Sequence, residues 1–181
     1  IAKLPEFEDV SKDKDFEKKY KDFIKKFPYD GNTRYDYDGI LNAKDELLRT
    51  IYATTTIAKS AMPSEELTKW IKKNPWIVNY AVYKNLKHKY MQATWKSWKK
   101  QDQEVSEKEI KNRWNKDADK KEHLFYAWTQ MRAAEQFKKA CDAVKKEGII
   151  IKGDMPILMN EDSCDAWALP GIFNQNLRAG S

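Results

Sequence analysis

A glycine followed by three isoleucines, Gly148-Ile149-Ile150-Ile151, constrains the fold of this chain more than any other feature. A short apolar run of β-branched residues is typical of a strand that is buried on both faces, as in a parallel sheet. Asp154 follows the run, and Pro156, which has no amide hydrogen to donate, ends regular pairing. The pattern therefore predicts a buried parallel strand with an acid at its carboxyl end, where barrel enzymes place catalytic and substrate-binding groups.

A long amphipathic helix is expected directly before this strand, over residues 122–147. Its apolar residues recur at steps of three and four, so they fall on one face; they are Leu124, Trp128, Met131, Ala134, Phe137, Cys141 and Val144. Lys145 and Lys146 stand in the last turn, where cations complement the helix dipole. Gly148 suits the left-handed residue that follows a helix end. Helix, glycine turn, strand and acidic loop together indicate one α/β unit.

Local start signals predict further helices upstream. Asp36 or Asp38 can cap one helix, and the run Thr54-Thr55-Thr56 weakens that helix without ending it. Asn74-Pro75 combines a cap with a proline at the first helical position, and we expect the helix it opens to run to about Trp98. Other signals are the helical pattern of residues 15–26, the loop signal at 28–32, Ser64 before two acids, and the capping-box spacing of Ser106 and Glu109.

The chain has 181 residues, whereas a complete eight-fold barrel needs about 250. The predicted fold class is therefore a predominantly α-helical fragment of an α/β (TIM-type) barrel enzyme, with five or six helices followed by one barrel strand and its acidic loop. Residues 1–121 are expected to form a helical subdomain inserted in the barrel. Residues 122–181 are expected to supply a barrel helix, the strand and the active-site loop after it.

Two sequence blocks around the predicted strand carry a family resemblance. They are Lys152-Gly153-Asp154-Met155-Pro156-Ile157 and Asn160-Glu161-Asp162-Ser163-Cys164-Asp165-Ala166-Trp167-Ala168 with Pro170 and Phe173. Upstream matches are Phe125-Tyr126-Ala127-Trp128-Thr129-Gln130, Asn74-Pro75-Trp76 with Tyr80-Ala81-Val82-Tyr83, and, more weakly, Tyr37-Asp38 with Ala43-Lys44. Together these blocks resemble the 4-alpha-glucanotransferases, which are the amylomaltases or disproportionating enzymes of glycoside hydrolase family 77.

The resemblance implies an enzyme that transfers α-1,4-glucan segments between maltooligosaccharides, starch or glycogen chains with retention of configuration. It implies that Asp154 hydrogen-bonds the glucan, with Asn160 as a second substrate-binding residue; the alternative for Asp154 is a structural role in its own loop. In the family the catalytic carboxylates and a sugar-holding aromatic loop lie outside this stretch. We therefore expect no catalytic residue here and no activity of this piece alone. Because the first residue is Ile1 and not Met, we also expect the natural start to lie further upstream.

The acidic residues of the second block could suggest a metal site, but their spacing does not fit one. Asn160, Glu161, Asp162 and Asp165 lack the Asp-x-Asp-x-Asp-Gly spacing of a calcium loop, and neither His88 nor His123 has metal-ligand spacing. No metal and no cofactor are therefore predicted. We expect Asp162 to cap a short helix over residues 163–168, and Trp167 to pack in the core rather than stack on a sugar.

The segment from Lys84 to Lys100 supports an alternative function. It holds six lysines and no acid, with Tyr90, Trp95 and Trp98 between them, and its charge equals the net charge of +6. Such a segment can bind single-stranded nucleic acid or a protein partner. Arginine is absent from it, however, and acids nearly balance bases in the chain. The preferred interpretation is a solvated helix face over an aromatic core, with no nucleic-acid partner.

Cysteine content and hydropathy bear on the location. Cys141 and Cys164 are the two cysteines, without CxxC spacing, which favours a reducing compartment and a cytoplasmic enzyme. No apolar run approaches 18 residues, so no membrane span is predicted. A lone barrel strand exposes two unpaired edges. The isolated piece is therefore expected either to self-associate through residues 149–152 or to tuck them against its own helices.

Overall fold

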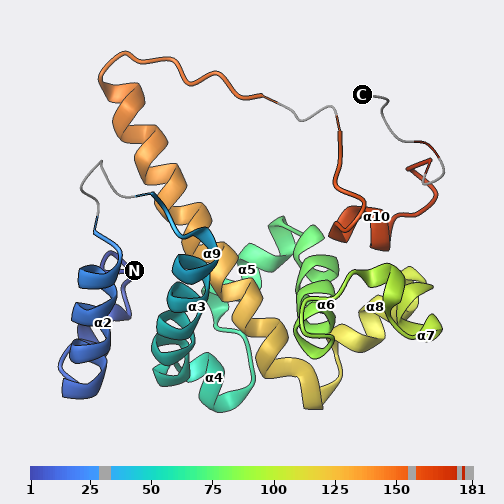
Figure 1. The fold of residues 1–181 in the computed structure, drawn as a ribbon, viewed down its shortest axis with the longest axis horizontal. Coiled ribbons are helices and arrows are strands. Elements are labelled where there is room, and N and C mark those ends of the chain that lie inside the picture. Colours follow the sequence, from blue (N-terminus) through green and yellow to red (C-terminus); the bar gives the residue numbers. More distant parts are fainter. Residues whose placement is uncertain (29–33, 155–157, 175–176, 178–181) are drawn as a thin grey trace. The chain divides into compact units, whose positions relative to one another are not determined.

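The computed structural model describes residues 1–28, 34–154, 158–174 and 177. Within these ranges the chain forms ten α-helices and one short 3-10 helix, and no strand (Figure 1). Six of the helices have eight or more residues, in agreement with the five or six helices predicted before the strand. The chain divides into two compact units, Ile1–Met62 and Pro63–Ser181.

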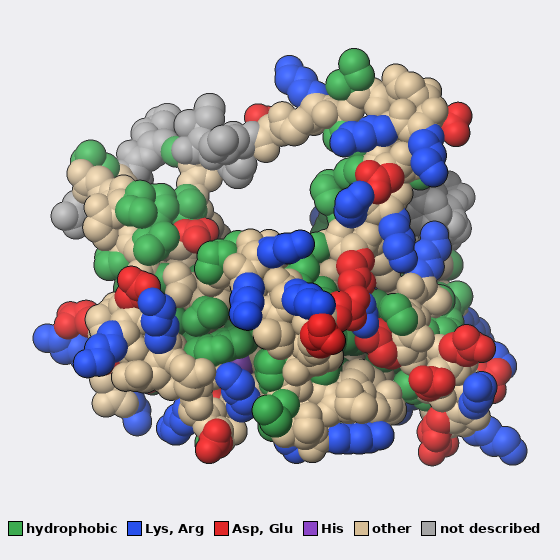
Figure 2. All heavy atoms as spheres, turned by 180° about the vertical axis from the view of Figure 1, so that it is seen from behind, with side chains coloured by type: hydrophobic (Ala, Val, Ile, Leu, Met, Phe, Trp, Pro, Cys, Tyr) green, Lys and Arg blue, Asp and Glu red, His purple; other side chains and the backbone are tan. Residues whose placement is uncertain are grey.

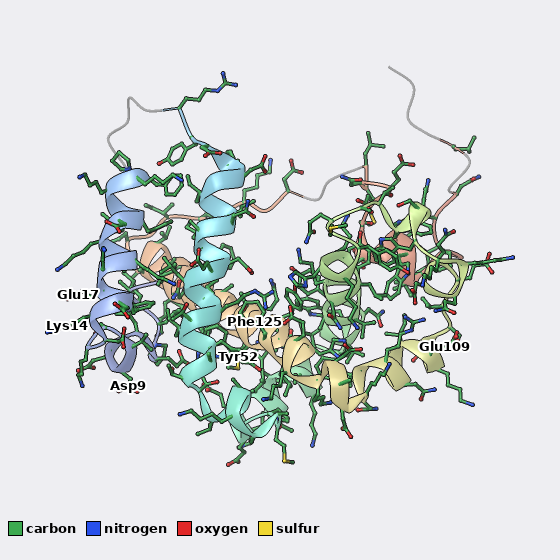
Figure 3. The ribbon with its side chains drawn as sticks, turned by 60° about the horizontal axis from the view of Figure 1, so that its bottom comes forward. Asp9, Lys14, Glu17, Tyr52, Glu109 and Phe125 are labelled. Carbon is green, nitrogen blue, oxygen red and sulfur yellow. The ribbon has the colours of Figure 1, made fainter. Side chains whose placement is uncertain are left out.

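Unit 1 is a small helical assembly around one long helix. Its elements are α1 (Phe7–Val10), α2 (Lys14–Lys26), α3 (Tyr37–Thr54) and α4 (Thr56–Ser60). Helices α1, α2 and α4 all contact α3. Their exposed faces carry charged side chains such as Asp9, Lys14 and Glu17, which Figure 3 labels on α1 and α2. Asp36 caps α3 as predicted, since its Oδ1 accepts from the amide of Gly39 at 2.9 Å.

The threonine run ends α3, so the prediction that it would not was wrong. Thr55 has an extended backbone, with φ −69° and ψ 153°. This conformation breaks the helical path and lets the Thr55 hydroxyl accept from the amide of Ala58 at 3.2 Å, which caps α4. The loop predicted at 28–32 falls mostly outside the described residues.

Unit 2 is organised around α6 (Trp76–Lys89). Helix α6 packs against α8 (Glu107–Trp114), α9 (Asp117–Lys146) and α10 (Cys164–Ala168), and α5 (Glu65–Lys73) packs against α9 (Figure 1). The 3-10 helix η1 (Trp95–Ser97) and α7 (Lys100–Gln103) connect α6 to α8. Fully buried aliphatic and aromatic side chains from these helices form the core, including Ile77, Val82, Ile110, Leu124, Trp128 and Trp167.

Local capping in unit 2 follows the sequence closely. Ser64 accepts from the amide of Leu67 at 3.1 Å and begins α5. Ser106 and Glu109 form the predicted capping box, in which the Glu109 carboxylate accepts from the Ser106 amide at 2.8 Å. Figure 3 shows Glu109 on α8. Each of these contacts spans three residues, so the sequence alone contains all the information they need.

Helix α6 is shorter than predicted, because it ends at Lys89 and not near Trp98. Met91 and Gln92 adopt positive φ angles of 49° and 65°, which a helix cannot contain. The Lys87 ammonium stabilises this turn by donating to the carbonyls of Gln92 and Ala93 at 2.8 and 3.1 Å. The turn allows Trp95 and Trp98 to fold back into the core of unit 2.

The strand predicted at Gly148–Ile151 is absent, which corrects the sequence interpretation. Residues 149–154 follow α9 without regular structure, and Ile149, Ile150 and Ile151 are 57%, 91% and 44% exposed. A parallel strand needs neighbouring strands for its backbone donors and acceptors, and no described segment supplies one. The exposure also shows that the expected tucking of this segment is wrong; its self-association stays a prediction.

The predicted helix before this segment is confirmed but begins earlier, at Asp117. Gly148 has the expected positive φ of 75°. Only the first half of the predicted apolar face is buried, through Leu124, Trp128 and Met131, whereas Phe137 in the second half is 70% exposed. The predicted boundary at 121/122 falls inside α9, while the contacts divide the chain after Met62; the assignment of 122–181 to a barrel stays a prediction.

Candidate functional site

The two predicted substrate-binding residues lie on either side of a gap in the described chain. Asp154 is exposed at the end of the irregular segment after α9. Asn160 is also exposed, and its Oδ1 accepts from the amide of Asp162 at 2.8 Å, so it shapes the turn before α10. Residues 155–157 lie outside the described residues. Glucan binding by Asp154 and Asn160 therefore stays a prediction.

The Asp162 carboxylate accepts hydrogen bonds from three residues that are distant in sequence. These contacts were not predicted from the sequence. Its Oδ2 accepts from Lys87 Nζ at 2.7 Å. Its Oδ1 accepts from the Tyr83 hydroxyl at 3.0 Å and from the Trp95 amide at 3.1 Å. The predicted capping role was wrong, because Ser163 caps α10 instead by accepting from the Ala166 amide at 3.1 Å.

These contacts fix the charge of Asp162. Burial raises the pKa of the Asp162 carboxyl, but the hydrogen bonds from Lys87, Trp95 and Tyr83 outweigh burial and hold it below its usual value. Burial and the neighbouring Asp162 carboxylate together raise the pKa of the Tyr83 hydroxyl. At neutral pH Asp162 is therefore an anion surrounded by donors, and Tyr83 keeps its proton.

The neighbouring residue, Glu161, makes two further contacts between the acidic loop and η1. Its backbone carbonyl accepts from Trp95 Nε1 at 2.8 Å, and its carboxylate accepts from Lys96 Nζ at 2.7 Å. The acidic turn after Asn160 is thus held against η1 and α6 by both backbone and side chains. No sequence spacing indicated this, because the partners lie more than 60 positions apart.

Trp167 packs in the core, as predicted, rather than presenting a face for a sugar. It is 1% exposed, and its Nε1 donates to the Asp102 carbonyl at 2.8 Å. Its ring contacts those of Tyr83 and Trp98, with centroids 5.6 and 6.2 Å apart. The aromatic cluster therefore joins α6, the segment after it and α10 into one packed body.

Two of the three aromatic side chains and three of the six lysines of the Lys84–Lys100 segment make contacts within the protein. Trp95 and Trp98 are buried, so their faces are not available to bases. Lys87, Lys89 and Lys96 form ion pairs with Asp162, Asp119 and Glu161 respectively. Over the face drawn in Figure 2, lysine and arginine side chains alternate with carboxylates. No observation favours the nucleic-acid alternative.

A groove of about 820 Å³ lies beside α10 in unit 2. Trp167, Pro170 and Phe173 of the second sequence block line it on one side, and the chain between α7 and α8 lines it on the other. Gln103, Glu104 and Ser106 place polar groups at its wall. Because Trp167 is 1% exposed, the aromatic side chain that this wall leaves partly open is that of Phe173.

Metal chemistry has no support among the described residues. They contain no group of three or more His, Cys, Asp or Glu side chains placed to hold a metal ion. Cys141 and Cys164 are free, and burial raises the pKa of the Cys164 thiol to about 12, which keeps it protonated. In the same part of the chain, no helix is both long and apolar enough to cross a membrane.

Comparisons with known proteins agree with the sequence resemblance. A family model described as 4-alpha-glucanotransferase matches residues 4–181. The 4-alpha-glucanotransferase of Clostridium butyricum is 30% identical over 148 residues, which are 81% of this chain and 29% of that protein. The Synechocystis 4-alpha-glucanotransferase is 28% identical over 143 residues, which are 78% of this chain and 28% of that protein.

A plant relative is also similar. The 4-alpha-glucanotransferase DPE2 of Oryza sativa subsp. japonica is 24% identical over 147 residues, which are 81% of this chain and 15% of that protein. The chain therefore spans less than a third of the length of these relatives. No solved structure matches it.

Proposed function

We propose, since this chain belongs to the 4-alpha-glucanotransferases of glycoside hydrolase family 77, that it forms part of an enzyme transferring α-1,4-glucan segments between maltooligosaccharides or starch chains. The single observation that carries this proposal is the family match over residues 4–181. The similarity to three proteins named 4-alpha-glucanotransferase supports it.

The reaction is a double displacement with retention of configuration. One carboxylate forms a covalent glycosyl-enzyme, and a second carboxyl group about 5–5.5 Å away acts first as acid and then as base. We assign neither group to the described residues. Asp154 instead holds the substrate, because a carboxylate can accept hydrogen bonds from two adjacent sugar hydroxyls. Asn160, six positions after Asp154 in the sequence, is the second substrate-binding residue that we propose.

The barrel assignment follows from the same proposal. Ile149 to Asp154 would become a strand when neighbouring barrel strands supply their backbone partners. Pairing would bury the three isoleucines, which are exposed without those neighbours. Asp154 would then stand at the carboxyl end of a barrel strand, which is the catalytic face of such barrels. The two free cysteines suit a cytoplasmic enzyme.

The test replaces Asp154 in the full-length enzyme and measures disproportionation of maltotriose. Asp154→Ala should lower kcat/KM by about 10- to 100-fold, because a charge-assisted hydrogen bond to the substrate is lost. Glu147→Ala is the matched control, since Glu147 is an exposed carboxylate just before the same segment. Unchanged turnover in the folded Asp154 variant would remove Asp154 from the site. Absence of transfer by the wild-type enzyme would overturn the function itself.

A further inference from the structure

A second cavity of unit 2 is unrelated to the acidic loop. It has a volume of about 550 Å³ and lies between the second half of α6, the start of α7, α8 and the start of α9. All of its walls come from residues between Val82 and His123. A volume of this size falls within the usual range of small-molecule sites, about 300–1,000 Å³.

The floor of this cavity is polar and deeply buried. Asn85 and His123 are 4% and 1% exposed, and Asn85 Nδ2 lies 3.1 Å from His123 Nε2. The other ring nitrogen of His123 lies 3.4 Å from the carbonyl of Trp114. Burial lowers the pKa of His123 to about 4, so the imidazole is neutral at physiological pH and contributes no charge to the cavity.

The two carboxylates of the cavity are already neutralised by cations in the same wall. Asp102 Oδ1 lies 2.5 Å from a guanidinium nitrogen of Arg113, and its Oδ2 accepts from the Tyr90 hydroxyl at 2.6 Å. Asp119 Oδ1 lies 2.5 Å from Lys89 Nζ. Asp102 therefore orients the Arg113 fork, which has further N–H donors beyond those used in this pair and in the bond to the Gln101 carbonyl.

Two further lysines, Lys99 and Lys116, are exposed and line the cavity. The cavity thus presents four cationic side chains against two carboxylates, an excess of two positive charges. Low-dielectric walls on one side strengthen the field that an ion experiences there. An excess of positive charge favours an anion over a neutral sugar or a cation.

We propose that this cavity binds a phosphate monoester of a small polyhydroxylated molecule, such as a hexose phosphate. A phosphate monoester carries a charge close to −2 at neutral pH, which would neutralise the excess of the cavity. The cavity is much larger than a phosphate group, whose size is comparable to a few water molecules of about 30 Å³ each. The side-chain amide of Gln101, an exposed residue that lines the cavity, offers hydrogen bonds to hydroxyl groups of the remaining body of the ligand.

This assignment goes beyond the proposed glucan transfer and does not depend on it. It would give the enzyme a site for a metabolite apart from the segment that carries Asp154. Binding there can be measured without any turnover, so failure of either proposal can be recognised separately.

The experiment titrates the full-length protein with glucose 6-phosphate by calorimetry at low salt, with inorganic phosphate and glucose as comparison probes. The double variant Lys99→Gln/Lys116→Gln removes the charge excess without touching the buried floor. It should weaken glucose 6-phosphate binding at least about tenfold. Lys100→Gln/Lys108→Gln is the matched control, because it removes the same charge from exposed lysines of α7 and α8 that do not line the cavity.

The expected result is measurable binding of glucose 6-phosphate, weaker binding of inorganic phosphate, none of glucose, and a loss specific to the Lys99/Lys116 variant. No binding of the ester at millimolar concentration would overturn the proposal. Equal losses in both double variants would overturn it as well, since a diffuse charge effect would then explain the binding. Equal affinity for inorganic phosphate and the ester would show that the cavity does not recognise the polyhydroxylated part of the ligand, and would overturn that part of the proposal.

Discussion

The ammonium of Lys87 lies 2.7 Å from Oδ2 of Asp162, a residue 75 positions later in the chain. This ion pair joins the last turns of α6 to the acidic turn before α10. Only 12% of the Lys87 side chain and 28% of the Asp162 side chain are exposed, so solvent screens the pair weakly. Together with the hydrogen bonds from Tyr83 and Trp95, the pair holds the acidic turn against α6 and η1.

Asp162→Ala should lower the free energy of unfolding by about 2–3 kcal/mol. The substitution leaves the Trp95 amide without its acceptor and the Lys87 ammonium without its carboxylate partner. The Tyr83 hydroxyl loses the same carboxylate but keeps the backbone carbonyl of residue 162. Urea denaturation at pH 7 measures the loss. Glu161→Ala is the matched control from the adjacent position; it removes an exposed ion pair with Lys96 and should cost less than about 1 kcal/mol. Equal losses would show that Asp162 has no special role.

Stability should fall as the pH is lowered from 6.5 toward 4, because of His123. Burial lowers the pKa of this imidazole to about 4, and the ammonium groups of Lys89 and Lys120 lower it further, while the Trp114 carbonyl and Asp119 oppose them. The unfolded chain, with a His pKa near 6.5, binds the proton that the folded chain excludes. The difference amounts to about 3 kcal/mol once the pH reaches 4.

The measurement compares unfolding free energies at pH 7 and pH 5 for the wild type and His123→Gln. The variant cannot take up a proton at this position, so its stability should change less between the two pH values. A difference between pH 7 and pH 5 that is the same in both proteins would contradict the assignment to His123. The comparison depends on the change with pH, so any constant loss in the variant does not affect it.

Trp167→Phe should destabilise unit 2 by about 1–3 kcal/mol, since the buried carbonyl of Asp102 loses its donor. Trp167→Ala should cost about 3–5 kcal/mol because it also leaves a cavity in the aromatic cluster. Trp76→Ala is the comparison, because Trp76 is about half exposed and its truncation should cost less. Thermal unfolding followed by near-ultraviolet circular dichroism measures all three. A neutral Trp167→Ala would show that the ring is not part of the core.

The 181-residue polypeptide on its own should self-associate through residues 149–152, and Ile150→Lys should reduce that association. A lysine on an exposed strand edge opposes pairing with another copy. Met91→Lys is the control, because Met91 and Ile150 are both 91% exposed. Sedimentation velocity over a range of concentrations measures the outcome. A strictly monomeric wild type would refute the prediction, as would equal effects of the two lysine substitutions.

Much of the helical fold could be read from short patterns. The caps at Asp36, Ser64 and Ser106 and the left-handed Gly148 are found where the sequence indicates them. The end of α6 at Lys89 was not predictable in this way. It depends on positive φ angles at Met91 and Gln92, two residues that no turn rule singles out.

The candidate site, too, was predictable in part from the sequence. The sequence blocks around Asp154 and Trp167 suffice to identify the family, which the family match confirms. They did not reveal the role of Asp162, because its donors lie on α6 and at the start of η1, 67 to 79 positions earlier. Nor did they reveal the cavity between α6 and α9, since its charges converge only when four helices pack together.

The sequence by itself determined where most helices begin and to which family the chain belongs, because capping contacts span three or four residues and the family blocks are contiguous. Tertiary structure alone decided which charges pair, which histidine is buried and whether Ile149 to Ile151 form a strand. Those outcomes depend on partners distant in sequence, and a strand has no stable form until another strand accepts its backbone hydrogen bonds.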